Sequence, residues 1–146
     1  MSDPFIPLTL FCLAGVLFAA WKGGPAERLG AAVVVLNIII GFASYRLTPE
    51  WVGIIRFFND GLAAVVMLGV TVIYGALWMG GVMLFYAAQF SLHAYYFVTD
   101  RPDSDRLHAI INNVDFSGIV WCLIIGAAVA WRRRVRIARA AAKTEA

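Results

Sequence analysis

The stretch Gly61–Val98 reads GLAAVVMLGVTVIYGALWMGGVMLFYAAQFSLHAYYFV and contains no Asp, Glu, Lys or Arg. A single helix of that length would measure about 57 Å at 1.5 Å per residue, whereas the hydrocarbon core of a bilayer is about 30 Å thick. The segment therefore has to cross the membrane, reverse and cross back. We place the reversal at Met79-Gly80-Gly81, where two glycines interrupt the apolar sequence.

The composition agrees with a membrane protein. Of the 146 residues, 62% are apolar and only 14% are charged, whereas a soluble domain carries about a quarter charged residues. The N-terminus does not resemble a signal peptide, because Asp3 stands where a basic segment should be and no small-residue cleavage site follows. The sequence predicts an all-α fold, a polytopic membrane helix bundle of about five transmembrane helices.

The predicted bundle covers residues 1–131, and residues 132–146 form a basic cytoplasmic tail. The spans are expected at about 5–21, 29–47, 50–78, 82–99 and 107–131. Thr48-Pro49-Glu50 is typical of a helix start, with a capping hydroxyl before a proline. Residues 50–60 are amphipathic, so they form either an interfacial helix or the top of the third span. A four-span bundle with one re-entrant segment is the alternative topology. Aromatic residues typical of membrane interfaces lie near the predicted ends, at Trp21, Tyr45, Trp51, Trp78 and Trp131.

The basic residues predict the orientation. Six of the twelve lie after Trp131, and basic segments beside a span stay in the cytoplasm. With five spans, the C-terminus is then cytoplasmic and the N-terminus outside the plasma (inner) membrane, as is the acidic loop after Thr99, which includes Asp103. The basic tail is expected to attract anionic lipid headgroups; a nucleic-acid partner is less favoured.

Polar residues recur at helical spacing in three spans. A central Asp facing lipid costs about 2.5–3.5 kcal/mol on insertion scales, so these faces should point inward. The small residues of the second span should allow close helix contact, so we expect Gly41→Leu to disrupt packing and a substitution of Ile39 to be mild. The three faces are Gly30, Asn37, Gly41 and Ser44; Tyr86, Gln89, His93 and Tyr96; and His108, Asn112, Asp115 and Cys122.

The depth of these residues in the membrane can be compared by counting inward from the ends of the predicted spans at 1.5 Å per residue. His93 lies about 9 Å below Thr99, Asp115 about 12 Å below Leu107, and Asp60 between the rim and about 16 Å deep. We therefore expect one polar cluster in the outer half of the bundle. Its members are Arg56, Asn59, Asp60, Gln89, His93, Asn112 and Asp115.

Three functions remain open. The cluster could carry a proton, an ion or a small polar solute, since histidine titrates near neutral pH. It could instead only lock the helices of an accessory subunit in a larger membrane complex. An enzyme or cofactor carrier ranks last, because the chain lacks G-x-S-x-G, H-E-x-x-H and a Gly-rich phosphate loop.

No metal or cofactor is expected. Cys12 and Cys122 form no redox motif, and a zinc site lacks closely spaced ligands. The depth count argues against a haem between His93 and His108, because His108 lies only about 1.5 Å below the rim. A homodimer or a larger complex is expected, since five helices offer little shielding for a pore.

The predicted orientation can be tested with reporter fusions at both ends of the chain. We expect a C-terminal fusion to report the cytoplasm and an N-terminal fusion the outside, because the basic residues after Trp131 hold the end of the last span inside. Two termini on the same side would contradict the five-span topology and require one apolar segment to be re-entrant.

Overall fold

The structure of the protein is a computed structural model that describes residues 5–44, 46, 49–101 and 105–144. Within these residues the fold has five helices and no strands, which confirms the all-α prediction. The predictions made for Tyr45, Leu47, Thr48 and Asp103 lie outside the described residues. The helices are α1 (Phe5–Lys22), α2 (Pro25–Ser44), α3 (Pro49–Tyr74), α4 (Leu77–Val98) and α5 (Arg106–Thr144).

Three of the helices are long and apolar enough to cross a membrane. They are α2, the Trp51–Tyr74 part of α3, and α5. The described apolar part of α1, Pro7–Lys22, is shorter. Gln89 and His93 lower the average hydropathy of α4, although α4 contains no residue with a full charge. Membrane location is therefore supported by three helices and not by five.

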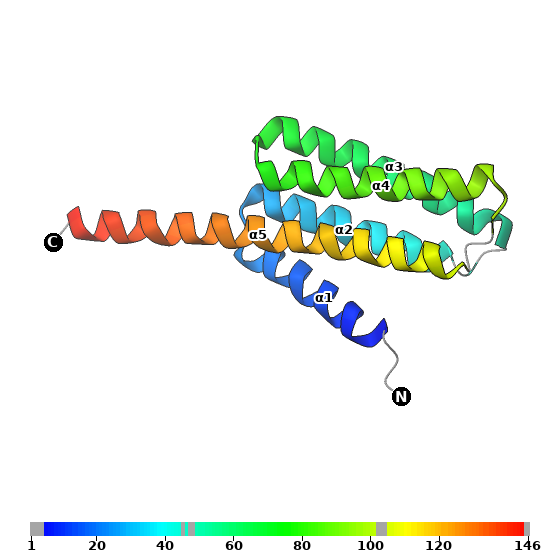
Figure 1. The fold of residues 1–146 in the computed structure, drawn as a ribbon. Helices are drawn as coiled ribbons and strands as arrows, with labels where there is room; N and C mark the ends of the chain where they lie inside the picture. The colour runs from blue at the N-terminus through cyan, green and yellow to red at the C-terminus, as the bar shows by residue number, and fades with distance from the viewer. Residues whose placement is uncertain (1–4, 45, 47–48, 102–104, 145–146) are drawn as a thin grey trace.

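The five helices form a closed ring. Helices that follow one another in sequence are in contact, and α1 packs on α5 to close the ring. Figure 1 shows the α3–α4 hairpin beside α2 and α5, with α1 on the opposite side of α5. Towards its N-terminal end α1 diverges from the other helices. The last part of α5 continues beyond the ring without a neighbouring helix.

The reversal between α3 and α4 lies at Gly75-Ala76, so its predicted position at Met79-Gly80-Gly81 is wrong. Gly75 has a φ of +63° and its N–H donates to the carbonyl of Thr71 at 2.8 Å. A left-handed residue after the last turn is a common helix ending, and glycine adopts it without steric cost. Gly80 and Gly81 lie inside α4.

The α1–α2 turn is only Gly23-Gly24, shorter than the interval between the predicted spans at about 5–21 and 29–47, and α2 begins at Pro25. The N–H of Gly24 donates to Glu27 Oε2 at 2.7 Å, as in a capping box. Glu27 Oε1 accepts a hydrogen bond from Trp78 Nε1 at 3.2 Å. The buried carboxylate thus ties the start of α2 to the start of α4.

Trp78 packs against glycines on two other helices. A Cβ at Gly126 of α5 would lie 2.5 Å from the indole ring, and one at Gly30 of α2 would lie 3.2 Å from it. Gly30 therefore makes the close contact expected of the small-residue face. Gly41 does not, because nothing lies within 4 Å of the position of its Cβ. The expectation of close packing at Gly41 is wrong, and Ile39 is exposed.

The basic residues after Trp131 continue α5 as one helix to Thr144. Arg134 donates hydrogen bonds to the carbonyls of Lys22 and of Gly23, which are among those left free at the end of α1. Trp131 packs edge-on against Phe18. The first turn of the basic segment therefore anchors α5 to α1, and its remainder is exposed.

The ring is filled by a large apolar core between the α1–α2 turn and the polar cluster, beside a smaller core of Ala26, Val70 and Met79. The side chains of the large core come from all five helices, so this layer closes the middle of the bundle to water. The buried members are Val16, Ala19, Ala31, Val34, Ala63, Met67, Val82, Tyr86, Ile119, Leu123 and Ala127.

The packing around Trp78 predicts different costs for two glycine substitutions. Gly126→Leu should lower the free energy of unfolding by about 1–3 kcal/mol or more, because the added atoms overlap the indole ring. Gly41→Leu should change it little, because its Cβ meets open space. Denaturant titration in mixed micelles would measure both. Equal losses would mean that the Trp78 contact has been misassigned.

Candidate functional site

A cavity of about 530 Å³ opens into the end of the bundle that holds the α4–α5 loop, and all five helices contribute to its wall. The α1 and α2 parts of the wall are mostly apolar, while α3, α4 and α5 supply polar side chains. The lining residues are Leu8, Thr9, Cys12, Leu13 and Val16; Val35, Asn37, Ile38, Gly41 and Phe42; Arg56, Asn59 and Asp60; Gln89 and His93; and Asn112, Asn113 and Phe116.

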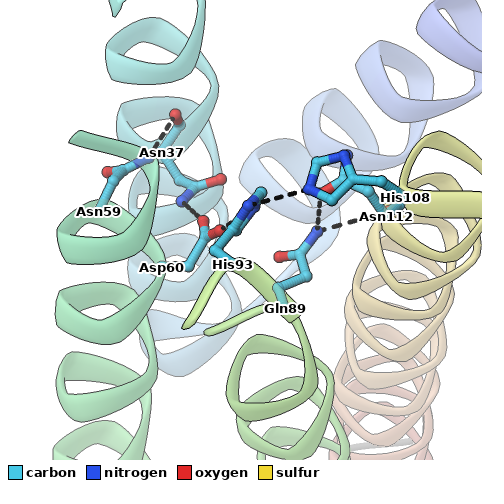
Figure 2. Close-up of polar contacts among 7 residues, drawn as sticks. All are labelled: Asn37, Asn59, Asp60, Gln89, His93, His108 and Asn112. Atoms are coloured by element: carbon cyan, nitrogen blue, oxygen red, sulfur yellow. Dashed lines mark hydrogen bonds and ion pairs between the residues drawn. The ribbon is translucent and has the colours of Figure 1, made fainter. Parts of the chain in front are cut away.

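Asp60 of α3 is the buried carboxylate of this cavity, with 6% of its surface exposed. Its Oδ1 accepts a hydrogen bond from Asn37 Nδ2 of α2 at 2.8 Å. Its Oδ2 lies 3.0 Å from His93 Nε2 of α4. Asn59 Nδ2 donates to the backbone carbonyl of Asn37 at 3.0 Å, which adds a second link between α2 and α3. Figure 2 shows these groups converging from three helices.

His93 also contacts His108 of α5. Nδ1 of His93 and Nε2 of His108 are 3.2 Å apart, and both side chains are buried. The depth count places the two residues at different heights in the bundle and therefore predicts that they do not meet. This prediction is wrong, because their side chains are in contact. The count compares positions along the helix axes, whereas the two side chains are each several ångströms long, and the 3.2 Å between their nitrogens is a hydrogen-bond distance.

The polar chain continues toward the α4–α5 loop. The ring of Tyr96 lies 4.6 Å from that of His108, centroid to centroid, and its hydroxyl donates to Asp105 Oδ2 at 2.7 Å. Asp105 Oδ1 accepts the N–H of Leu107 and so caps α5. The Tyr96 hydroxyl and then this N–H hold the pKa of Asp105 below its usual range. The stabilisation from its anionic form is present at neutral pH and is lost as the pH falls through that lowered pKa.

The hydrogen-bond partners determine which ring nitrogen of each histidine carries the proton. Asp60 as a carboxylate only accepts, so His93 donates from Nε2 and its Nδ1 is the acceptor in the neutral ring. His108 then donates from Nε2 to His93 Nδ1. Every donor therefore points toward Asp60, from Asn37 on one side and from the two histidines on the other.

Gln89 completes the polar wall between α4 and α5. Its Nε2 makes long contacts of 3.4 and 3.5 Å to the side-chain and backbone oxygens of Asn112. Its Oε1 is buried with no hydrogen-bond partner among the described residues. In Figure 2 this oxygen points away from Asn112, to the side on which Asp60 and His93 lie.

Asp115 is the predicted cluster member that the structure does not bring into the cavity. At helical spacing it shares a face of α5 with Gly118 and Cys122, which pack on Phe85 and beside Gly81 of α4. It is 8% exposed, and its Oδ2 has no partner among the described residues. The other six predicted residues, Arg56, Asn59, Asp60, Gln89, His93 and Asn112, all line the cavity.

Sequence reasoning gave too little weight to four residues. Asn37 was assigned only to a mildly polar face, yet an amide in an apolar helix needs a partner, and here that partner is Asp60. His108 lies one turn from Asn112 on the same stripe. Tyr96 is on the stripe of His93, and Asp105 carries the capping signal just before a helix. Among the described residues no group of three or more His, Cys, Asp or Glu could hold a metal ion.

The different surroundings of the two buried carboxylates predict opposite effects of the same substitution. Asp60→Leu should lower the free energy of unfolding by about 1–3 kcal/mol, because Asn37 and His93 lose their acceptor in a buried site. Asp115→Leu should leave it unchanged or raise it, since Oδ2 has no donor to lose. Denaturant titration in mixed micelles gives both values. A larger loss at Asp115 would contradict this assignment.

Comparison of the chain with protein-family models, curated proteins and solved structures finds no match.

Proposed function

We propose that this chain is a small multi-pass membrane protein that moves protons, alone or with a small polar solute, through the Asp60–His93–His108 chain of its cavity. The observation that carries the proposal is the unbroken run of hydrogen bonds from Asp60 to His108, in which both histidines can accept and release a proton. Between this run and the α4–α5 loop lies Tyr96, whose ring packs on that of His108 and whose hydroxyl donates to Asp105.

The topology that fits this function has five crossings, with the N-terminus outside and the C-terminus in the cytoplasm. Support comes from three helices of sufficient length and hydropathy and from the ring, in which α1 and α4 pack alongside these three. The exposed basic end of α5 would then lie against anionic lipid headgroups of the inner leaflet. The cavity would open in the outer half of the plasma (inner) membrane.

Proton movement along this chain needs only shifts between neighbouring atoms. When a proton binds Nδ1 of His108, the proton on its Nε2 can pass to Nδ1 of His93. The proton on Nε2 of His93 then passes to Oδ2 of Asp60, and both rings end neutral with exchanged tautomers. The cavity thereby gains a proton taken up near the loop, and the reverse sequence releases it.

Complete transport also needs a path on the other side of the site. On α2, the polar residue Asn37 at the cavity and the acidic residue Glu27 near the opposite end are separated by about 15 Å along the helix. Buried apolar side chains fill the bundle between these two levels. In the proposed topology this arrangement would correspond to an outward-open state that the apolar layer closes on the inner side. Tyr86 is buried in that layer, and its hydroxyl has no partner among the described residues.

An accessory subunit is the second candidate, and one observation favours it. The chain from Asn37 through Asp60 and His93 to His108 joins α2, α3, α4 and α5. Hydrogen bonds between membrane helices contribute about 0.6 kcal/mol each on average, so this set alone could fix the packing of the bundle. A homodimer or larger complex would then supply the activity.

The two candidates differ in the behaviour of His93→Gln. Glutamine can still hydrogen-bond but cannot titrate, so transport through His93 predicts at least about a tenfold lower proton flux with a melting temperature close to that of the wild type. The flux is measured with a trapped pH-sensitive dye in liposomes that contain the purified protein.

Asp115→Asn is the matched control, because it alters a buried carboxylate outside the cavity. Normal flux in Asp115→Asn together with loss in His93→Gln supports transport. Absence of flux in the wild type refutes transport and leaves the accessory subunit. Equal flux in the wild type and in His93→Gln would show that protons take another path.

A further inference from the structure

We infer that the cavity binds the head group of a neutral, hydroxyl-bearing amphiphile that enters sideways from the membrane between α1 and α2. This inference builds on the proposed function, because such a ligand would occupy the cavity to which the Asp60–His93 chain is proposed to deliver protons. Its test measures binding and not flux, so that either idea can fail without the other.

The position of the opening supports entry from the membrane. The exposed residues of the cavity wall all belong to α1 and α2, while its α3, α4 and α5 residues are buried or half-buried. The exposed residues of the wall are Thr9, Leu13, Val35 and Phe42. Figure 1 shows α1 diverging from its neighbours toward this end. The gap therefore faces the apolar surroundings of the bundle, which are lipid in a membrane protein.

The wall indicates a ligand with two unlike parts. Apolar side chains such as Val16, Ile38 and Phe116 suit a hydrocarbon chain, and the polar side chains lie together at the α3–α4–α5 side. A volume of about 530 Å³ falls within the usual range for small-molecule sites. A polar head with one hydrocarbon chain would match this division.

The polar side of the cavity favours a neutral head that donates hydrogen bonds. Arg56 and Asp60 carry opposite formal charges, and the described wall contains no further Asp, Glu, Lys or Arg. Gln89 is 2% exposed, and its Oε1 is an acceptor without a donor among the described residues. A buried acceptor left without a donor is costly. A hydroxyl group on the ligand would supply the donor without adding charge.

Native mass spectrometry of the purified full chain tests this inference. The probes are monooleoylglycerol and a decyl-substituted hydroquinone, which share a hydroxyl-bearing neutral head but come from different lipid classes; oleic acid is the charged comparison. We expect one neutral probe to remain bound per chain, and the stronger of the two identifies the source. Gln89→Leu should weaken its binding roughly tenfold, as expected for the loss of one hydrogen bond.

Gly41→Leu and Gly69→Leu form a matched pair. Nothing lies within 4 Å of the Cβ position of either glycine, but only Gly41 lines the cavity. Gly41→Leu should abolish probe binding while the melting temperature is kept, and Gly69→Leu should bind like the wild type. Stronger binding of oleic acid than of both neutral probes would overturn the inference. So would equal binding in the two variants, no binding of either probe, or a dimer that excludes the probe.

Discussion

A carboxylate within a bundle of apolar helices has to find its hydrogen-bond donors in the protein, because hydrocarbon supplies none. Asp60 meets this requirement with Asn37 on one oxygen and His93 on the other. Since His93 in turn contacts His108, the needs of one carboxylate restrict the rotation of α2, α3, α4 and α5 about their axes. A rotation of any of these helices by one residue would break a link of the chain.

The opposite end of the bundle is fixed by different contacts. Trp78 lies against Gly30 and Gly126 and donates to Glu27, and Arg134 caps α1. These contacts hold the helices close together where the core is apolar. At the other end α1 diverges from the other helices, and it packs mainly on α5, with Gly15 against Val120 and Ile124. The cavity follows from this difference between the two ends.

The all-α fold could be predicted from Gly61–Val98, because an uncharged segment too long for one crossing leaves few alternatives. The position of its reversal could not, since Gly75, Gly80 and Gly81 are equally plausible breaks by composition. Only the backbone shows that Gly75 adopts the left-handed conformation. The same limit applies to Asp115. Helical spacing put it on the stripe of His108 and Asn112, but a stripe is wide enough to face both the cavity and the α4 contact.

Depth counting could indicate which residues share a level but not which of them touch. It brought Asp60 and His93 together, and it missed His108 because it treated side chains as points on a helix axis. The contact matters for the proposed function, because a proton delivered to Asp60 would change the charge of the cavity. An anionic Asp60 and a protonated Asp60 would present different net charges to an occupant of the cavity. Binding of the proposed ligand and of a proton at this site would therefore be linked, and by thermodynamic necessity each would change the affinity of the other by the same factor.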